Sequence, residues 1–240
     1  MCSHTLVRGL ALACLLAAAP HAAASGLQIA PTSLTLASGG PAQAVWLTNT
    51  GDSVLRAQVR AFRWSQAEGK DALDPTQALV ASPPMLSIPP GGRQLVRVIR
   101  TGAEAASGEQ TFRLLIDELP ISDGKQKGVQ YVLRYSVPVF VGVGTAPDLH
   151  WSATADGGEI QLDIRNAGTA HAQISTLSLA TADGATTPLV PGLLGYVLPD
   201  ATMHWTVEVP AGATTANAHI KAEINGEPTD QTLSPGAPSR

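Results

Sequence analysis

The chain has 240 residues, of which 44% are hydrophobic and 14% charged, and its net charge is −4. This length suits two small domains, and the weak acidity argues against a nucleic-acid partner. The charge is uneven, with +2 over residues 26–147 and −7 over residues 148–240. We therefore expect the basic groups of the first half to meet specific carboxylates.

Residues 1–25 have the features of a secretory signal peptide, with cleavage expected after Ala24 or Ser25. The apolar run of this segment is too short to span a membrane. Both cysteines, Cys2 and Cys14, lie inside it, so the mature chain has none. Lipid attachment at Cys14 is the alternative interpretation. We expect a soluble protein exported to a bacterial periplasm.

After the signal peptide, short apolar runs with period two alternate with Gly, Pro, Asn and Asp, which predicts an all-β fold. Ser65–Asp74 is polar and is expected to be a loop. Ser82–Gly92 is expected to be extended and then to turn. The strands predicted in this half are Leu27–Leu36 (kinked or switched at Pro31), Ala44–Thr48, Leu55–Arg63, Ala78–Ala81, Arg93–Arg100 and Thr111–Leu119.

The longest predicted strand is Val129–Val143, where every odd position is apolar over fifteen residues. A typical strand has about 5–6 residues. Pro138 lacks a backbone donor and indicates that the strand lies at a sheet edge there. Long apolar edge strands recruit other strands. We interpret this one as a strand that lends its side chains to another protein.

The second half has shorter predicted strands and a polar tail, Pro228–Arg240. We expect an N-terminal immunoglobulin-like domain over residues 26–144 and a C-terminal β-sandwich over 145–240. The connection is short, so the domains should meet at a fixed angle. The strands predicted here are Leu149–Thr154, Glu159–Ile164, Ala170–Leu179, Thr186–Leu189, Met203–Val209 and Ala218–Ile224.

No catalytic constellation is visible in the sequence. The mature chain has no cysteine nucleophile and no phosphate-binding glycine loop. Its four histidines lack metal-ligand spacing and are interpreted as surface or strand residues. Asp117 and Glu118 are adjacent on a strand, so they point to opposite faces and are expected to form structural or interdomain salt bridges. We expect no enzyme activity, cofactor, metal or small-molecule substrate.

Arg113 and Arg134 are unusual because each lies inside a strongly apolar strand. One interpretation is a solvated charge at a strand edge or face. The other is a receptor for a carboxylate, which a guanidinium binds through two parallel hydrogen bonds. The sequence leaves both open.

Several stretches together resemble the PapD-like periplasmic chaperones of chaperone–usher pili. Their residues are most similar to those of the archaic or spore-coat branch. The resemblance covers the whole mature chain and is weaker in the second domain, at Ile164-Arg-Asn166. The stretches that carry it are Ser82-Pro-Pro, Ile88-Pro-Pro-Gly-Gly, Gln94-Leu-Val-Arg-Val98, Glu109-Gln-Thr-Phe-Arg-Leu-Leu-Ile-Asp-Glu-Leu-Pro120 and Arg134-Tyr-Ser-Val-Pro-Val-Phe-Val141.

The resemblance implies two immunoglobulin-like β-sandwich domains in an L-shaped or boomerang arrangement. It also implies a mechanism: residues 129–141 fill the groove of a pilus subunit that lacks its last strand, and the subunit is then delivered to an outer-membrane usher without ATP. The subunit's C-terminal carboxylate would be anchored in the cleft between the domains. The donated residues would be Val129, Tyr131, Leu133, Tyr135 and Val137.

The sequence departs from the better-known branch of this family at the carboxylate anchors. The two cationic positions of that branch align with Ser33 and Pro138, which carry no charge. Arg113, with Arg134 second, is the expected replacement. An arginine that bridges the domains in that branch aligns with Gly142, so Glu118 is expected to lack that partner.

Two other functions were compared with an assembly chaperone. A pilus subunit or adhesin domain would have one incomplete domain and an N-terminal extension of alternating apolar residues, neither of which is seen here. A carbohydrate-active or hydrolytic enzyme would need a convergent acid–base pair. The sequence does not identify the cognate subunit or usher, or whether the free protein self-associates.

Overall fold

The structure is a computed structural model that describes residues 26–37, 40, 42–102, 108–120, 131–156, 158–181, 184–211, 213 and 218–232. The signal peptide expected at 1–25 and the donor residue Val129 lie outside this part of the chain. Every regular element in the described part is a β-strand. No helix there is long and apolar enough to cross a membrane.

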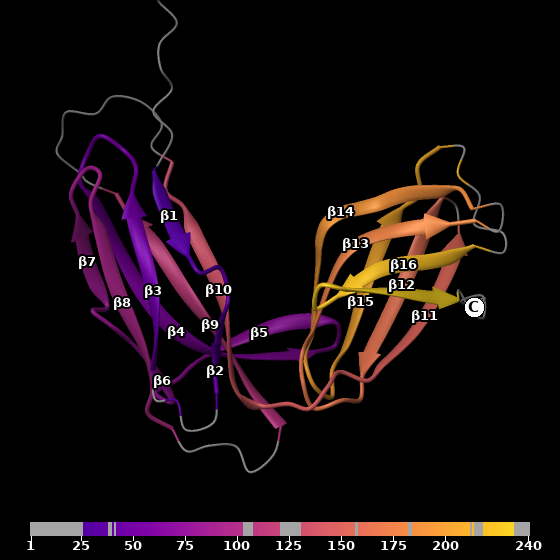
Figure 1. The fold of residues 1–240 in the computed structure, drawn as a ribbon, viewed down its shortest axis with the longest axis horizontal. Coiled ribbons are helices and arrows are strands. Elements are labelled where there is room, and N and C mark those ends of the chain that lie inside the picture. Colours follow the sequence, from indigo (N-terminus) through magenta and orange to yellow (C-terminus); the bar gives the residue numbers. More distant parts are fainter. Residues whose placement is uncertain are drawn as a thin grey trace, which may run out of the picture.

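The first half folds into a sandwich of two sheets (Figure 1). Its strands are β1 (Leu27–Ala30), β2 (Leu34–Leu36), β3 (Ala42–Asn49), β4 (Leu55–Ala67), β5 (Lys70–Pro75), β6 (Leu79–Ser82), β7 (Met85–Ile88), β8 (Arg93–Arg100), β9 (Gly108–Leu119) and β10 (Arg134–Val143). One sheet has the order β1-β3-β8-β6. The other has the order β2-β10-β9-β4-β5, with β7 also paired to β4.

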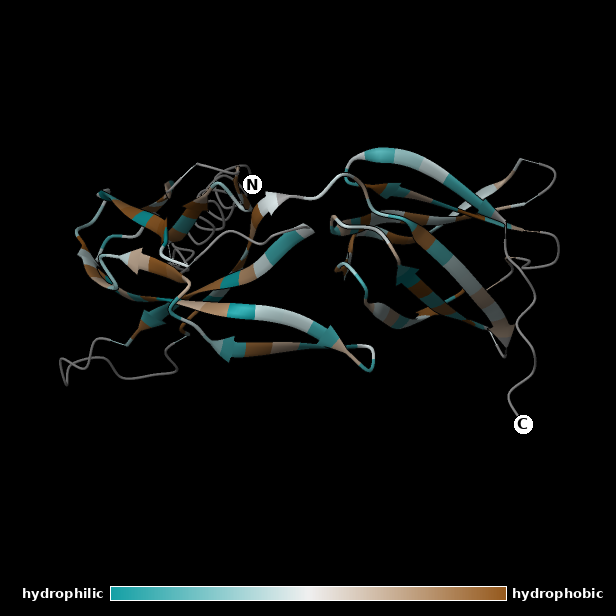
Figure 2. Ribbon diagram, turned by 90° about the horizontal axis from the view of Figure 1, so that it is seen from below, coloured by the Kyte–Doolittle hydropathy of each residue, from teal (hydrophilic) through white to brown (hydrophobic). Residues whose placement is uncertain are grey.

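The core of this sandwich is made by the inward positions of alternating strands. Val45 and Leu47 of β3 and Leu114 and Ile116 of β9 are completely buried. Figure 2 shows hydrophobic and hydrophilic bands alternating along the strands. The period-two pattern therefore predicted the burial correctly because each strand has one face on the core.

Two sequence expectations for this half have different outcomes. The first strand does switch at Pro31, since β1 pairs with β3 in one sheet and β2 pairs with β10 in the other. The loop expected at Ser65–Asp74 is wrong: β4 and β5 form a hairpin there, with Ala67 opposite Lys70. The segment reads as polar because both faces of β5 are exposed, so it has no apolar face for a pattern to reveal.

The second half is a second sandwich of two sheets, ordered β11-β12-β15 and β14-β13-β16-β17. Its strands are β11 (Leu149–Asp156), β12 (Glu159–Asn166), β13 (Ala172–Ala180), β14 (Thr186–Val197), β15 (Thr202–Glu208), β16 (His219–Ile224) and β17 (Glu227–Thr232). The fold class, two immunoglobulin-like sandwiches, is as predicted, and they stand at an angle in an L-shaped arrangement (Figure 1).

The start of the predicted polar tail is instead a strand. β17 pairs with β16 through a turn at Asn225 and Gly226, whose φ angles are 52° and 86°. Two consecutive positive φ values define a type I′ hairpin turn, for which Asn-Gly is the preferred pair. The hairpin signal was thus present in the sequence, but the following strand is polar and carries Pro228.

The two sandwiches meet over a shared apolar cluster. Trp64 of β4 and Phe140 of β10 are both 2% exposed and belong to the core of the second sandwich. Their partner there is Tyr196 at the end of β14, at ring-centroid distances of 5.5 and 6.0 Å. The first sandwich therefore supplies part of the second one's core.

Candidate functional site

The outer edge of β10 is open over half of its length. β2 pairs with β10 only at Val139–Val141, whereas β9 pairs along its other side from Arg134 to Val143. Among the described residues, no strand covers the outer edge from Arg134 to Pro138. The edge expected at Pro138 is therefore present, and it exposes unpaired backbone groups that can accept another strand.

The segment just before β10 is apolar and exposed. Tyr131, Val132 and Leu133 are 81%, 50% and 40% exposed. β10 begins at Arg134, whereas the sequence predicted a strand from residue 129. β9 continues to Leu119, and a hydrogen bond from Glu118 N to Leu133 O (2.9 Å) extends the pairing one residue beyond the strand.

Further along β10, the inward side chains belong to the chain's own core. Val137 is 4% exposed. Tyr135 packs against the same core, and its hydroxyl donates to the Leu27 carbonyl oxygen at 2.7 Å. Of the predicted donor residues in the described chain, Tyr131 and Leu133 are free to enter a partner, whereas Tyr135 and Val137 already fill this domain.

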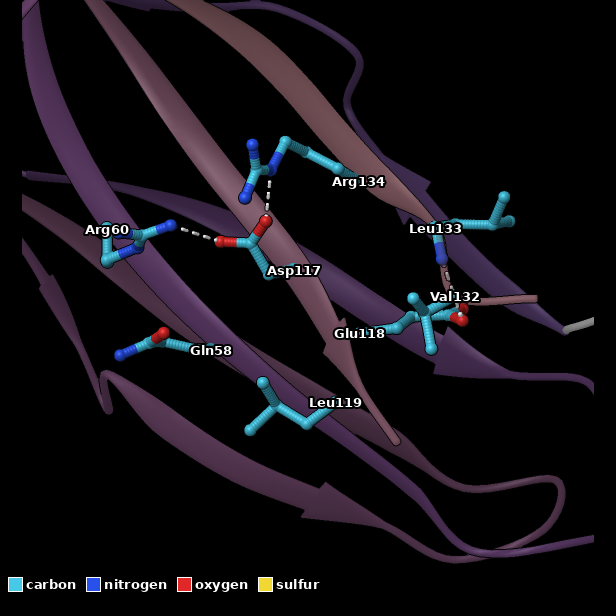
Figure 3. Close-up of a pocket in the computed structure, with 8 residues that line it drawn as sticks. All are labelled: Gln58, Arg60, Asp117, Glu118, Leu119, Val132, Leu133 and Arg134. Atoms are coloured by element: carbon cyan, nitrogen blue, oxygen red, sulfur yellow. Dashed lines mark hydrogen bonds and ion pairs between the residues drawn. The ribbon is translucent and has the colours of Figure 1, made fainter. Parts of the chain in front are cut away.

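Arg134 lies at an open pocket of about 420 Å³ beside the exposed segment (Figure 3). Its Nε donates to Asp117 Oδ1, and Arg60 Nη2 donates to Asp117 Oδ2 at 2.7 Å. Burial raises the pKa of Asp117, but the hydrogen bonds and charges of Arg134 and Arg60 outweigh it and hold that pKa below its ordinary value. Asp117 thus forms structural salt bridges, as expected, and its carboxylate already pairs with the guanidinium of Arg134.

The pocket also contains a contact that orients the exposed segment. The carboxylate of Glu118 accepts a hydrogen bond from the Leu133 backbone N–H at 3.3 Å. Together with the bond between Glu118 N and Leu133 O, this fixes the chain at the point where it leaves the sheet. The exposed segment therefore starts from a defined position and direction.

Arg113 lies where the two sandwiches meet. It faces Pro138 across the β9–β10 ladder, and its guanidinium carbon lies 3.6 Å from the ring centroid of Trp64 and 5.2 Å from that of Tyr196. Its side chain is 13% exposed, and Asp71 Oδ2 lies 4.0 Å from its Nη2. Burial lowers the pKa of Arg113, and the charge of Asp71 opposes this. At neutral pH the group stays charged.

Arg113 and Arg134 do not form one site. Arg113 of β9 lies opposite Pro138, which is four residues from Arg134 on β10. This corresponds to roughly 13 Å along a strand. In this structure the two arginines also have different neighbours, which are Asp117 for Arg134, and Trp64, Tyr196 and Asp71 for Arg113. Of the two predicted anchors, only Arg113 contacts both sandwiches.

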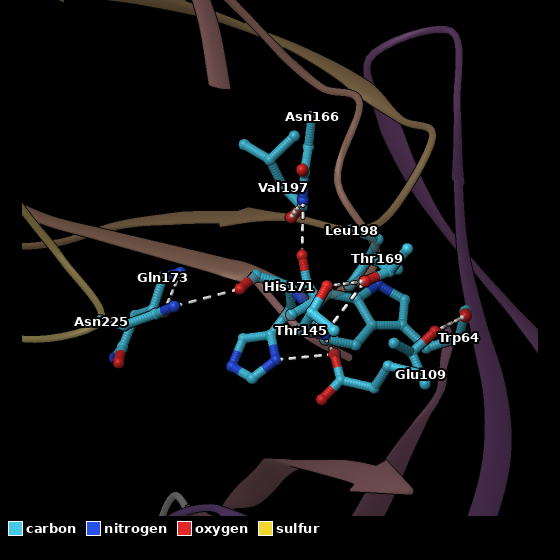
Figure 4. A network of polar contacts seen from close by, with 12 residues as sticks. Trp64, Glu109, Thr145, Asn166, Thr169, His171, Gln173, Val197, Leu198 and Asn225 are labelled. Carbon is cyan, nitrogen blue, oxygen red and sulfur yellow. Dashed lines mark hydrogen bonds and ion pairs between the residues drawn. The ribbon is translucent and has the colours of Figure 1, made fainter. Parts of the chain in front are cut away.

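A polar network completes the junction of the sandwiches (Figure 4). Glu109 of β9 accepts hydrogen bonds from the His171 backbone N–H at 2.9 Å and contacts His171 Nδ1 at 2.8 Å. The imidazole stacks on Phe140 with a centroid distance of 3.4 Å. His171, interpreted from the sequence as a surface or strand residue, is therefore an interface residue. No local sequence signal marks it, because its partners Glu109, Phe140, Tyr196 and Asn225 are 25 or more residues away.

The described residues contain no group of three or more His, Cys, Asp or Glu side chains that could hold a metal ion. The features that stand out are therefore an exposed apolar segment, an open strand edge and an interdomain arginine. Together they describe a surface that can pair with another polypeptide.

Comparison with known proteins agrees with this description. Residues 26–142 match the family of pili and flagellar-assembly chaperones, PapD N-terminal domain. A chain of the CsuC–CsuE chaperone–tip adhesion subunit pre-assembly complex, from the archaic chaperone–usher Csu pili of Acinetobacter baumannii, is 24% identical with a TM-score of 0.65; the match covers 88% of this chain and 99% of that one. No curated protein matches the sequence.

Other solved structures are similar over the same extent. The CupB2 chaperone of Pseudomonas aeruginosa is 16% identical with a TM-score of 0.56, covering 86% of this chain and 100% of that one. A chain of the SafA pilin–SafB chaperone complex of Salmonella enterica is 15% identical with a TM-score of 0.60, covering 88% and 97%.

The match of residues 26–142 and the all-β, two-sandwich fold make this chain similar to the PapD-like chaperones of the chaperone–usher type. The first domain belongs to the PapD N-terminal domain family, and the chain as a whole is PapD-like. This family and fold are those of non-enzymatic chaperones.

Proposed function

We propose that this protein is a periplasmic chaperone that binds pilus subunits by donating residues 129–141 to their incomplete fold and passes them to an outer-membrane usher. The observation that carries the proposal is the open edge of β10 preceded by the exposed Tyr131 and Leu133. Strand addition at such an edge gives affinity through backbone hydrogen bonds and specificity through alternate side chains.

The exposure pattern favours Tyr131 and Leu133 over Tyr135 and Val137 as the side chains that a subunit receives. Burying each exposed apolar side chain contributes about 1.5–3 kcal/mol. Val137 is 4% exposed and already stabilises its own domain. Val129 remains a predicted donor that lies outside the described residues.

Arg113 is the proposed anchor for the subunit's C-terminal carboxylate. It lies opposite Pro138, the position at which the better-known branch of the family has a lysine. Asp71 is its one carboxylate neighbour in the described part of the chain, and the 4.0 Å separation leaves guanidinium donors unused. We place the domain boundary at residues 144–145, between β10 and β11.

Co-purification tests the proposal. The protein is expressed in a periplasm with candidate subunits encoded beside it, and wild type is compared with Leu133→Glu and Arg113→Ala. We expect a one-to-one complex that Leu133→Glu abolishes, because a charge would enter an apolar groove. Val54→Glu is the matched control, since Val54 is 43% exposed against 40% for Leu133.

Two outcomes would contradict parts of the proposal. A complex that survives Leu133→Glu would show that the exposed segment is not donated. A complex lost in Leu133→Glu but unaffected by Arg113→Ala would keep strand donation and move the anchor elsewhere, with Arg134→Ala tested next.

A further inference from the structure

The β4–β5 hairpin leaves the first sandwich and reaches the second (Figure 1). Its turn consists of Glu68 and Gly69, with φ angles of 53° and 69°, the type I′ geometry that follows the natural twist of two strands. All six residues of β5 are exposed, so packing within the first sandwich does not explain why this hairpin is retained.

The tip of the hairpin packs so closely against the second sandwich that no side chain fits at Gly69 without a shift of its neighbour. A Cβ atom added to Gly69 would lie 2.4 Å from Cδ2 of His204, a residue of β15. Turning the imidazole of His204 away from the added atom would break its Nδ1 contact with Asp163 Oδ1. Glycine is therefore required at this position for steric reasons as well as for its positive φ.

The shaft of the hairpin is bonded to the end of β14. The Gln66 side chain donates from Nε2 to the Tyr196 carbonyl oxygen and accepts at Oε1 from the Leu198 N–H, both at 2.9 Å. These two hydrogen bonds join one side-chain amide to two backbone groups at the end of β14. They therefore fix both the distance and the direction of the hairpin relative to that strand. Trp64, two residues earlier on the same face, packs edge-on against the ring of Tyr196.

The same hairpin contacts Arg113. Asp71 lies opposite Gln66 in the ladder, and its Oδ1 accepts a hydrogen bond from Gln66 Nε2 at 2.9 Å. The second carboxylate oxygen of Asp71 lies 4.0 Å from Arg113 Nη2. A continuous series of contacts therefore runs from the second sandwich through Gln66 and Asp71 to the guanidinium.

We infer that the β4–β5 hairpin is a strut that sets the angle between the two sandwiches, and that Gln66 and Asp71 are positioning residues for Arg113. The importance of Arg113 for subunit binding rests on the proposed function; the strut itself does not. The strut contacts the second sandwich at two separated points, the Gly69 tip and the Gln66 shaft, so it resists both closing and twisting.

The test is a distance measurement on the full chain. Spin labels on Met85→Cys and Leu193→Cys, both 53% exposed and in different sandwiches, report the interdomain distance by pulsed electron paramagnetic resonance. We expect Gly69→Ala to shift and broaden the distance distribution, and Gln66→Ala to broaden it. Gly91→Ala is the matched control, because Gly91 also has a positive φ of 67° but has no atom within 4 Å of an added Cβ.

A second variant separates the steric contact from general misfolding. In Gly69→Ala with His204→Ala the clashing ring is absent, so the wild-type distance should return. A Gly69→Ala distribution identical to that of wild type would overturn the strut. A changed distance together with unchanged binding of a co-expressed subunit would keep the strut and count against Arg113 as the anchor.

Discussion

Asn166 is a buried side chain whose four hydrogen bonds connect three segments of the second sandwich. It is 0% exposed, donates to the carbonyls of Ala170 and Val197, and accepts from the N–H groups of Asp148 and Gly168 at 2.8–3.1 Å. The Asn-Ala-Gly sequence is typical of a turn, but no local pattern shows that the Asn166 side chain reaches Val197 of β14.

We predict that Asn166→Ala lowers the free energy of unfolding by about 3 kcal/mol, because buried backbone groups lose their partners. Urea denaturation at neutral pH measures this. Asn225→Ala is the control, since its side chain makes exposed hydrogen bonds in a turn and should cost about 1 kcal/mol or less. Equal effects of the two changes would contradict the role of Asn166.

Asp117 predicts an acid dependence of stability. Its folded-state pKa is below the ordinary value of 3.8 because the hydrogen bonds and charges of Arg134 and Arg60 outweigh burial. A lowered pKa contributes stability that is present above 3.8 and is lost as the pH falls through the folded value. Asp117→Asn should therefore be less stable than wild type at pH 7, by about 1 kcal/mol given the exposed arginines, and the difference should vanish in acid.

Urea titrations at neutral and acidic pH check this prediction. Asp52→Asn is the control, because Asp52 is an exposed residue outside the Asp117 ion pairs. An Asp117→Asn difference that is constant over the whole pH range would contradict the assignment of the ion pairs.

At the scale of elements, β10 and the segment before it have different surroundings. The segment is exposed, whereas the inward side chains of β10 are buried in the core of their own domain. The alternating pattern of Val129–Val143 identified the strand and its apolar positions. The pattern could not show that the regular strand begins only at Arg134, so that Tyr131 and Leu133 stay exposed while Val137 is buried. Similarly, the β4–β5 hairpin was missed because pairing between two polar segments leaves no periodicity.

This division predicts opposite effects of two changes on the same face. Val137→Ala should lower the free energy of unfolding by about 2 kcal/mol, because Val137 is 4% exposed in the core. Leu133→Ala should leave stability within about 0.5 kcal/mol of wild type, because exposed sites tolerate truncation, and it should weaken subunit binding instead. Urea denaturation and co-purification measure the two quantities. A destabilising Leu133→Ala would mean that the segment packs on its own domain.

At the scale of the molecule, the two sandwiches share a core. Phe140 of β10 and Trp64 of β4 pack with Tyr196 and His171, so the interface is apolar as well as hydrogen-bonded. Composition and the period-two pattern were enough to predict two sandwiches, and the short connection between them predicts a fixed angle. The aromatic residues of the interface are far apart in sequence and could not be predicted to meet.

A shared core predicts coupled unfolding. Phe140→Ala should lower the free energy of unfolding by about 3–5 kcal/mol and should destabilise the second sandwich although the residue belongs to the first. Calorimetry should show one cooperative transition for the wild type, shifted as a whole in the variant. Two separate transitions, of which Phe140→Ala shifts only the one that belongs to the first sandwich, would contradict the shared core.

The central claim is that β10 and the residues before it pair with another polypeptide. Hydrogen–deuterium exchange of the free chaperone and of its complex with a co-expressed subunit tests this most directly. We predict that the amides facing the open edge within residues 131–137 exchange rapidly in the free protein and become the most strongly protected on binding, because a partner strand covers that edge. Protection confined to other strands, with residues 131–137 unchanged, would contradict strand donation.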